Sequence, residues 1–554
     1  MSVLMFAACP VLKIRPLPFA IDEIEFSVWL KTLTATDAPK CCKELMQVLK
    51  ALNNHPMPDS IRLFFLEKLE PVLFRLTDRL IPGSVPESPS LPLLAEHHEI
   101  EIAVWACAEL ANGYALLSRE ESFRAGVYSV PQKSLIISHG LQALGKALLH
   151  ISQTYKKPYA GFWLNCFQFY RLAQQNNLTT DAAASEAQAI DKAFKHILVF
   201  SLSNSNQFSP SEMRAIYDLL SRYSEHAKLL SVVPEKKFKG IPCIYLDKNL
   251  PPAIPDPAVH KEDENTLYIA TVEVAGKILE ASSDKNLHAC PADKAMLLRL
   301  AKTLTLNPQR KYPRKKTADK QFGIIGFNDV IFYLRKQALT AEDPSGKGLI
   351  NLPRPGELRE LHLEIINPEQ KSPTMRQSEY SSEQAVGIFT FDEAPLEVTR
   401  IDPEDIWNSR QKKEIQANIK LVDASEKGFG LIWISPDVQL RIGDILGLQN
   451  KDFSLAIGVI RRLAQSEEFG LFAGVEMLGI NPQAIEFSNP GYPDSGMEAI
   501  YLPGEETESI ILSTNNFRPA EFIFIYKAFK KIRYRITRHL TATALINQFA
   551  VVKS

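Results

Sequence analysis

Apolar residues follow a helical spacing in the first part of the chain. In the segment Ser60–Leu80 they recur at positions i, i+3 and i+4, so that they line one side of a helix. Asp59 or Ser60 is placed to cap this helix at its start, and Pro71, inside it, predicts a kink or a break. The same spacing predicts further helices over Ile100–Leu117, Leu135–Tyr155 and Gly161–Gln174.

A helix start is indicated at Ser209-Pro210-Ser211-Glu212. This segment has the form of a capping box with proline at the first helical position, and it predicts a helix through Leu220. The segment GFWLNCFQFYRLAQQ, which begins at Gly161, is similar to the aromatic pattern of tetratricopeptide-type helical pairs, although no fixed repeat length is present. We therefore predict a helical, helical-repeat-like domain over residues 1–235.

The pattern changes near Val233, where β-like segments begin. Alternating or branched apolar residues predict strands around Gly240–Leu246 and Thr266–Val274, and a helical spacing returns in Asp293–Leu306. These features predict an α/β connecting region over residues 236–305.

A basic segment and a strand-like run come next. The basic segment Gln309–Lys316 precedes the apolar run Gln321–Leu334, and we assign residues 306–336 to an arginine-bearing arm and the first strand of a barrel. Residues 337–410 are rich in Pro, Glu, Ser, Gln and Gly, which predicts an insertion or linker.

Short apolar runs separated by turn residues fill residues 411–490, and this pattern is typical of a small antiparallel barrel. The runs are Ile415–Val422, Gly428–Ile434, Leu440–Leu448, Leu455–Leu463 and Phe469–Met477. Residues 491–554 predict a C-terminal, β-rich, basic extension. The fold class that we predict is multidomain α+β, with an all-α N-terminal helical array followed by a C-terminal antiparallel β-barrel.

The composition of the chain limits the classes of protein to which it can belong. The chain has 554 residues, too many for one core, and its net charge of -1 indicates that any electrostatic function lies in local patches. The seven cysteines are scattered, which predicts reduced, buried thiols and a cytoplasmic location. No apolar run reaches the length that a bilayer requires, so we expect no membrane insertion. The segment before Cys9 resembles a lipoprotein signal but lacks a basic start, and an N-terminal strand or arm is the simpler interpretation.

Catalytic signatures are absent from the sequence. It contains no nucleophile elbow, phosphate-binding loop, dinucleotide fingerprint or zinc-protease motif. His97-His98-Glu99 with Glu101 is the nearest approach to a metal site, but acidic residues are favoured at a helix start in any case. We therefore expect no enzyme, no metal and no cofactor.

Two short motifs carry chemistry suited to a phosphorylated guanine ligand. In the first, Arg310-Lys311-Tyr312-Pro313-Arg314, Pro313 disfavours a helix, so Arg310 and Arg314 can wrap around a ligand. Guanidinium forks bind phosphates and the O6/N7 edge of guanine, and they also stack on bases. Tyr312 could stack on a base as well.

The second motif is Asp423-Ala424-Ser425-Glu426-Lys427-Gly428, which predicts a turn between strands. Asp423 can accept hydrogen bonds, Ser425 offers a hydroxyl, and Gly428 permits a positive φ and a close approach of backbone. Each motif is weak alone: a basic run is usually a solvated surface, and D-x-S-x-x-G is good turn chemistry.

An R-x-x-x-R arm followed by a barrel that carries [DN]-x-S-x-x-G resembles the PilZ family of bacterial cyclic di-GMP receptors. Leu440–Ile445, Ala456–Leu463 and Phe469–Met477 resemble later parts of the same domain. The resemblance implies that Arg310 and Arg314 hold phosphates and guanine, and that Asp423, Ser425 and Gly428 contact the other guanine. It implies a non-enzymatic second-messenger receptor whose ligand is cyclic di-GMP.

One departure is that more than a hundred residues separate the two motifs. Either a long insertion splits the barrel, or the arm belongs to another subdomain and the barrel is a degenerate scaffold that binds only proteins. In the first case, ligand binding would order the arm and reposition the helical region, which would contact an unidentified effector protein. Lys527–Arg538 alternates basic with apolar residues and could bind nucleic acid, but a solvated strand face is the favoured interpretation.

Overall fold

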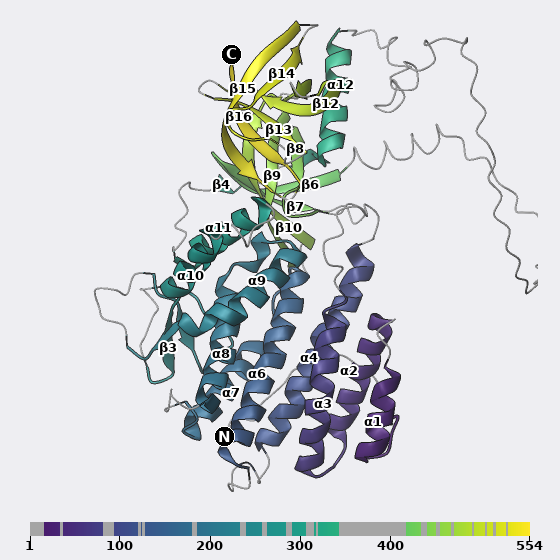
Figure 1. Ribbon diagram of the computed structural model, residues 1–554, viewed down its shortest axis with the longest axis vertical. Helices are drawn as coiled ribbons and strands as arrows, with labels where there is room; N and C mark the ends of the chain where they lie inside the picture. Colours follow the sequence, from purple (N-terminus) through teal and green to yellow (C-terminus); the bar gives the residue numbers. More distant parts are fainter. Residues whose placement is uncertain are drawn as a thin grey trace, which may run out of the picture.

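The helical part and the β part of the chain lie at opposite ends of the long axis of the molecule (Figure 1). The structure is a computed structural model, and it describes residues 16–33, 37–80, 93–119, 123, 128–179, 185–232, 240–256, 263–283, 291–305, 315–316, 320–342, 417–433, 440–449, 455–466, 470–489, 492–504, 507–513, 517–527, 530–543 and 545–554.

The helical part is an array of upright helices that share one core. Its elements are α1 Glu23–Thr32, α2 Ala38–Asn54, α3 Asp59–Thr77, α4 Leu93–Arg119, α6 Val130–Gln153, α7 Phe162–Gln175, α8 Ser185–Leu202, η1 Ser205–Gln207, α9 Pro210–Tyr223 and η2 Ser224–His226. Helix α4 packs against α2 on one side and against α6 on the other, and α6 also packs against α8. The predicted helical array is confirmed.

Helix α4 has a composition that would suit a membrane. Its segment His98–Arg119 is long and apolar enough to cross a bilayer, yet 78% of its most apolar window is buried inside the molecule. The neighbouring helices therefore cover the apolar surface that a membrane would otherwise cover, as in the core helix of a water-soluble fold.

The helix ends test the predicted caps. The Ser209 side chain accepts a hydrogen bond from the Glu212 N–H, and the Glu212 carboxylate accepts one from the Ser209 N–H, so this capping box is confirmed. For α3 the prediction was wrong: the N-cap is Pro58, without a side-chain cap, and Asp59 is the first helical residue. Helix α3 also continues through Pro71, because Pro71 is exposed while the residues around it are held in the core.

The connecting region extends the helical core. Its sheet has the antiparallel order β1-β3-β2, and the elements are β1 Lys228–Leu230, β2 Cys243–Tyr245, β3 Thr266–Ala270, α10 Val272–Ser283 and α11 Pro291–Thr305. The predicted strand at Thr266–Val274 is shorter in the structure, because α10 begins at Val272. Side chains of α10 and α11 join the same buried cluster as the helices before them.

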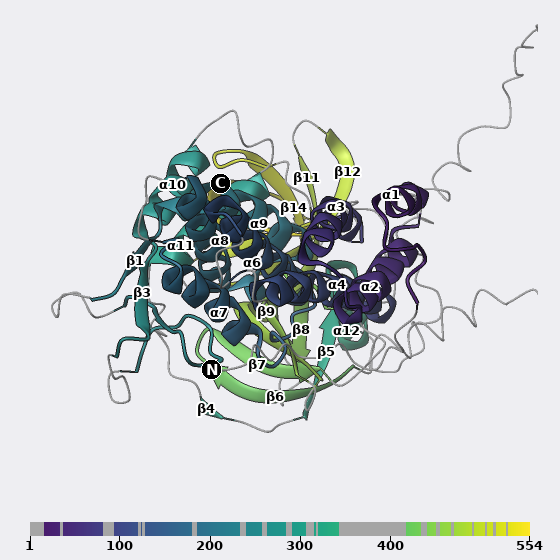
Figure 2. The same cartoon turned by 90° about the horizontal axis from the view of Figure 1, so that it is seen from below.

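The first barrel is built from strands on both sides of residues 343–416, which lie outside the described part of the chain. Its strands are β4 Lys315–Lys316, β5 Lys320–Ile325, β6 Ala417–Ser425, β7 Gly428–Trp433, β8 Ile445–Gln449, β9 Leu455–Ser466 and β10 Gly470–Ile480. The order is β4-β6-β5-β8-β9-β10-β7, and β7 also pairs with β6, so β5 to β10 close on themselves. Figure 2 shows β4 and β6 beside each other at the rim.

The run Gln321–Leu334, which we predicted as one strand, contains a strand and a helix. Strand β5 ends at Ile325, Gly326 takes a positive φ of 99°, and α12 begins at Phe327 and ends at Glu342. The chain turns at Gly326 because glycine alone adopts this conformation without strain. The helical spacing of Val330, Ile331 and Leu334 then buries one side of α12 between the barrels.

A second closed barrel follows, where we predicted only a β-rich extension. Its strands are β11 Gln483–Asn489, β12 Tyr492–Leu502, β13 Glu508–Leu512, β14 Phe522–Lys527, β15 Lys530–Ala542 and β16 Asn547–Lys553, in the order β11-β12-β13-β16-β15-β14. Strand β11 pairs with both β12 and β14. The structure therefore places the boundary before Gln483 rather than after residue 490.

Tyr155 joins the helical array to the first barrel. Its ring packs against the buried clusters of both parts, and its carbonyl accepts a hydrogen bond of 2.9 Å from the Gln465 N–H of β9. Its hydroxyl donates to the Phe208 carbonyl at 3.1 Å. Its φ of 57° is unusual for a residue other than glycine, and this turn directs the chain from the end of α6 toward the barrel.

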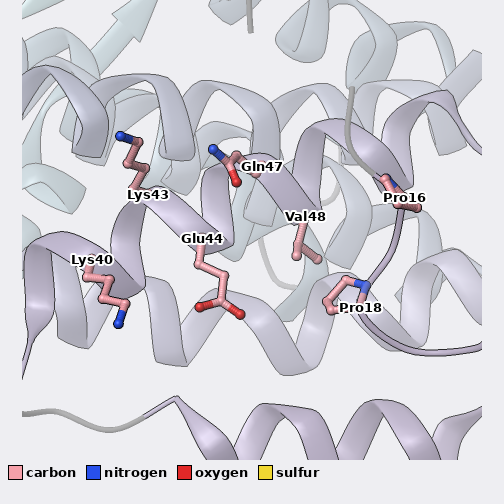
Figure 3. A pocket seen from close by; sticks show the side chains of 7 residues that line it. All are labelled: Pro16, Pro18, Lys40, Lys43, Glu44, Gln47 and Val48. Atoms are coloured by element: carbon pink, nitrogen blue, oxygen red, sulfur yellow. The ribbon is translucent and has the colours of Figure 1, made fainter. Parts of the chain in front are cut away.

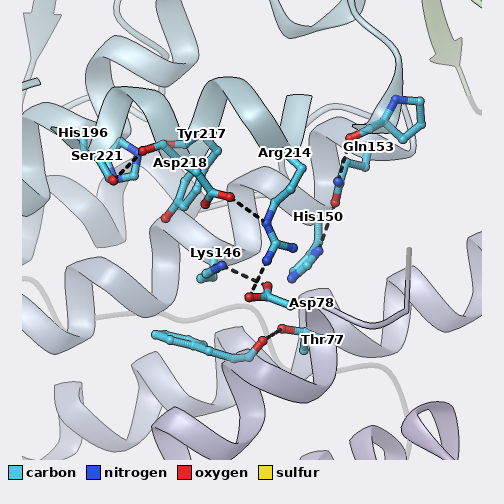
Figure 4. Close-up of polar contacts among 12 residues, drawn as sticks. Thr77, Asp78, Lys146, His150, Gln153, His196, Arg214, Tyr217, Asp218 and Ser221 are labelled. Carbon is cyan, nitrogen blue, oxygen red and sulfur yellow. Dashed lines mark hydrogen bonds and ion pairs between the residues drawn. The ribbon is translucent and has the colours of Figure 1, made fainter. Parts of the chain in front are cut away.

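Half-buried and buried polar residues connect α3, α6 and α9 near that joint (Figure 4). The Asp78 carboxylate forms ion pairs with Lys146, at 3.0 Å, and with Arg214. The His150 Nδ1–H donates to the Gln153 side chain at 3.1 Å, while its Nε2 is buried without a partner. Burial, together with the nearby positive charge of Lys146, lowers the pKa of His150 to about 4.

Strand β7 approaches β10 closely at Gly428. A Cβ added there would lie 2.3 Å from the Val475 carbonyl oxygen, which belongs to the backbone. Gly428 is not among the residues with positive φ, so the reason for glycine at this position is the lack of space. Of the two properties that glycine permits at this position, the structure uses the close approach of backbone and not the positive φ.

We predict that His150 and His196 make the helical array sensitive to acid. Burial lowers the pKa of His196 also to about 4, below the value near 6.5 of an unfolded chain. Their contribution to stability is therefore complete above about pH 6.5 and is lost as the pH falls toward 4, by on the order of 1 kcal/mol per pH unit for each histidine. The free energy of unfolding can be measured by urea unfolding, followed by helical circular dichroism, at several pH values. It should fall less between pH 6.5 and pH 4 in His150→Gln/His196→Gln than in the wild type. His55→Gln, at an exposed position, should retain the wild-type slope; equal slopes in all three proteins would refute the prediction.

A second prediction concerns Gly428. Gly428→Ala should destabilise the first barrel by about 2 kcal/mol or more, because the new methyl group meets fixed backbone. The matched control is Gly276→Ala in α10, where nothing lies within 4 Å of the added Cβ. That change should stabilise its helix by roughly 0.5–1 kcal/mol. Thermal unfolding of both variants measures the difference, and equal tolerance of the two substitutions would contradict the packing argument.

Candidate functional site

The two residues that follow the first sequence motif lie beside the second motif in the first barrel. Arg310, Tyr312 and Arg314 lie outside the described residues, but the next two residues form β4. In the register of β4 with β6, Lys315 pairs with Ala424 and Lys316 pairs with Asp423. The residues that follow the R-x-x-x-R motif therefore lie directly beside the D-x-S-x-x-G motif.

The turn that carries the second motif is held by its own side chain and by β10. The Ser425 hydroxyl donates to the Gly428 carbonyl at 3.2 Å, and the Met477 N–H donates to the Lys427 carbonyl at 3.0 Å. Asp423 and Ser425 are half-buried, whereas Glu426 is exposed. Ser425 thus shapes the turn in addition to offering a hydroxyl oxygen near its surface.

A β-bulge turns Asp423 to the outside of the barrel. Leu421 pairs with Leu431 in the core, but the register shifts by one residue at Val422, and Asp423 then pairs with Gly430. In a regular strand, Leu421 and Asp423 would share a face. The extra residue instead places the carboxylate opposite the core, which is a common use of bulges near binding sites.

A row of cross-strand partners extends from Asp423 across the outer face. Asp423 pairs with Gly430, Gly430 with Gly474, and Gly474 with Arg462. A Cβ on Gly430 would lie 2.5 Å from Asp423 Oδ1 and 3.1 Å from the Phe472 ring, and one on Gly474 would lie 3.2 Å from Arg462 Cβ. We call this surface, floored by the two glycines and flanked by Asp423, Phe472 and Arg462, the glycine saddle.

The glycine saddle spans four strands, β6, β7, β10 and β9. With strands about 4.8 Å apart, its two charged ends are separated by about 14 Å of sheet, measured between backbones. A second bulge, at Arg461, occurs where β9 passes the saddle, and Arg461 pairs with Glu476 at 2.7 Å. Sequence reasoning missed Gly430, Gly474, Phe472 and Arg462, because their proximity depends on the register of four strands.

The turn before β8, where the sequence resembled a known domain, is also well ordered. The Asp444 carboxylate accepts a hydrogen bond of 2.7 Å from the Arg441 N–H, and Gly443 has a φ of 94°. Burial raises the pKa of Asp444 to about 6. Gly443 contacts Thr543 of the second barrel, so this turn serves the junction between the barrels.

Other parts of the molecule are weaker candidates for a binding site. A pocket of about 360 Å³ lies beside α2 and is lined by Pro16, Pro18, Lys40, Lys43, Glu44, Gln47 and Val48 (Figure 3). The Glu44 carboxylate there already accepts a hydrogen bond from the Trp29 indole at 3.1 Å. Glu101 forms an ion pair with Lys156, and no group of three or more metal-ligating side chains occurs within the described ranges.

The five cysteines in the described ranges form no disulfide and are buried, as predicted. They are Cys41, Cys42, Cys107, Cys166 and Cys243. Burial raises the pKa of the Cys42 thiol to about 12, so that this thiol stays protonated at neutral pH.

Two family models match this chain. Residues 25–235 match the N-terminal domain of the cyclic-di-GMP receptor FimW, and residues 243–484 match its middle PilZ domain. No curated protein and no solved structure matches the chain. The second model spans the arm, the long segment and the D-x-S-x-x-G motif, whereas the second barrel lies almost entirely beyond it. The chain belongs to the FimW family of cyclic-di-GMP receptors, with its PilZ domain in the first barrel.

Proposed function

We propose that this chain binds cyclic di-GMP on the outer face of the first barrel, between the R-x-x-x-R arm and the glycine saddle. The observation that carries the proposal is the pairing of Lys315 and Lys316 with Ala424 and Asp423. Arg314 directly precedes Lys315, the pairing partner of Ala424, and this supports an arm that reaches the second motif. A ligand with two phosphates and two guanines needs both kinds of group at once.

The roles of the residues follow from their chemistry. Arg310 and Arg314 would hold the phosphates through charge-assisted, bidentate hydrogen bonds, with Tyr312 placed to stack on a base. Asp423 would accept hydrogen bonds from the N–H edge of a guanine, and the Ser425 turn would fix its position. Arg462 would donate to the O6 and N7 acceptors of guanine, whereas adenine has a donor amino group in place of O6. No group in this arrangement performs covalent chemistry, so we propose a receptor and not an enzyme.

The proposed signal would travel along β9 to the helical array. Arg462 belongs to the glycine saddle, and Gln465, three residues further along, donates its N–H to the Tyr155 carbonyl. Nearby, Arg299 of α11 forms an ion pair of 2.6 Å with Glu212 at the start of α9. Ligand binding that orders β9 would therefore act on the ends of α6 and α9, and through them on an effector protein bound to the helical array. We propose that this takes place in the cytoplasm, where buried thiols remain reduced.

Titration calorimetry with cyclic di-GMP tests the binding site. Wild-type protein should bind with micromolar affinity or tighter, and Arg310→Ala/Arg314→Ala should weaken binding by about a hundredfold or more, because two charge-assisted contacts are lost. Lys31→Ala/Lys157→Ala, with the same change in charge on distant helices, should bind like the wild type. Absence of binding by folded wild-type protein would leave a scaffold that binds only proteins, and unchanged binding by the arginine variant would place the phosphates elsewhere.

The glycine saddle has its own test. Gly474→Val adds side-chain volume on the outer face without meeting backbone, so the barrel should stay folded while affinity falls by about tenfold or more. The matched control is Gly496→Val, at an exposed strand position in the second barrel. Arg462→Gln should reduce the preference for cyclic di-GMP over cyclic di-AMP by about tenfold or more, since glutamine pairs better with adenine. Unchanged affinity and preference in both variants would exclude the saddle but would leave the arm and Asp423 in place.

A further inference from the structure

Strands β14 and β15 of the second barrel expose a ladder of rings and cations. Directly paired residues on the outer face are Phe522 with Arg535, Phe524 with Arg533, and Tyr526 with Lys531. The three rings are half-buried and the three cations are exposed. We call these six residues the cationic ladder. Neither family model covers it, and it is separate from the site proposed for cyclic di-GMP.

The rings hold the cations in place. The Arg533 guanidinium lies 3.8 Å from the centroid of the Phe522 ring, and the Lys531 ammonium lies 4.3 Å from that of Phe524. A cation over an aromatic face is stabilised by the ring quadrupole, and a stacked guanidinium has its hydrogen-bond donors directed sideways and outward. Two of the ladder's three positive charges, those of Lys531 and Arg533, are therefore held against aromatic rings.

The part of the chain that the structure describes provides no carboxylate partner for these charges. Within the described residues, Lys531, Arg533 and Arg535 form no ion pair with a carboxylate. By contrast, Arg335 of α12 contacts Glu498 at 2.8 Å and Glu486 at 3.2 Å, and Arg461 of β9 contacts Glu476 at 2.7 Å. In a chain whose net charge is -1, three adjacent unpaired cations form a local positive patch.

The ring coverage and the closed barrel together limit what can bind. A membrane or a nucleobase would require open aromatic faces, but Phe522 and Phe524 are covered by cations. Strand addition is also excluded, because β14 and β15 both have partners on each side. What remains available is a straight row of cations that carboxylates can approach from outside.

We propose that the cationic ladder binds an extended acidic segment of a partner protein, with carboxylates at alternate positions. Lys531, Arg533 and Arg535 are successive outward residues of one strand, so they are spaced about 6.8 Å apart. An extended peptide has the same spacing between residues i, i+2 and i+4. Three carboxylates at those positions can each face one of the three cations. Carboxylates on a helix, or at consecutive positions, do not have this spacing.

Two fluorescent peptides of equal composition test this match with the full-length protein. In one, glutamate alternates with threonine; in the other, the glutamates are contiguous. Anisotropy titration at low salt should give about tenfold tighter binding of the alternating peptide, because only it can form all three ion pairs without bending. Raising the salt concentration should weaken both complexes. Equal affinity for the two peptides would overturn the proposal, and this comparison requires no variant.

Substitutions locate the binding surface. Affinity for the alternating peptide should fall by about tenfold in the ladder variant Lys531→Gln/Arg533→Gln/Arg535→Gln. A control variant loses the same charge at scattered exposed positions, Lys31→Gln/Lys157→Gln/Lys302→Gln, and its affinity should change by less than about twofold. Arg533→Lys/Arg535→Lys, which retains the charge, should give intermediate affinity. Equal losses in both triple variants would show that net charge alone is responsible. Binding of oligothymidylate through the ladder without binding of the peptide would assign the face to nucleic acid and refute the proposal.

Discussion

Backbone pairing across the long segment between β5 and β6 is the interaction on which the first barrel depends. Strand β5 pairs with β6 and with β8, and β4 continues the same edge of β6. Because the entropy of loop closure grows only with the logarithm of loop length, each doubling costs about 0.6 kcal/mol more. The closure of the barrel readily offsets such a cost, so a chain can contain a segment of this length and still pair β4 with Asp423.

The barrel that this pairing closes is connected on two sides. Side chains of α12 share one buried cluster with residues of β8, β9, β12 and β13, so the helix between β5 and β6 seals the junction with the second barrel. On the other side, Tyr155 packs into the cores of both the helical array and the first barrel. Strand β9 takes part in both junctions as well as in the glycine saddle. Strand β9 is therefore an element of the first barrel that touches both of its neighbours.

Local patterns in the sequence predicted what depends on local interactions. The capping box at Ser209 and the strands that follow Asp423 are fixed by neighbouring residues, and the structure has them. The apolar run Gln321–Leu334 was ambiguous, since a continuous apolar segment fits a strand or a buried helix equally well, and only the positive φ of Gly326 separates the two. The second barrel was missed because closure by β11 and β14 is a pairing between residues that are distant in sequence.

The candidate site shows the same limit at the level of single residues. Alternation along β6 would place Asp423 on the same side as Leu421, in the core, where an unpaired carboxylate is costly. The bulge at Val422 instead places Asp423 on the outer face. A second bulge at Arg461 shifts the register of β9 where that strand passes Gly474. A motif can show that an aspartate and a serine occur at a suitable spacing, but the face they occupy is decided by bulges, which depend on the partner strands. The two glycines are informative in the same way: the register alone places Gly430 and Gly474 side by side, between an acidic and a basic residue.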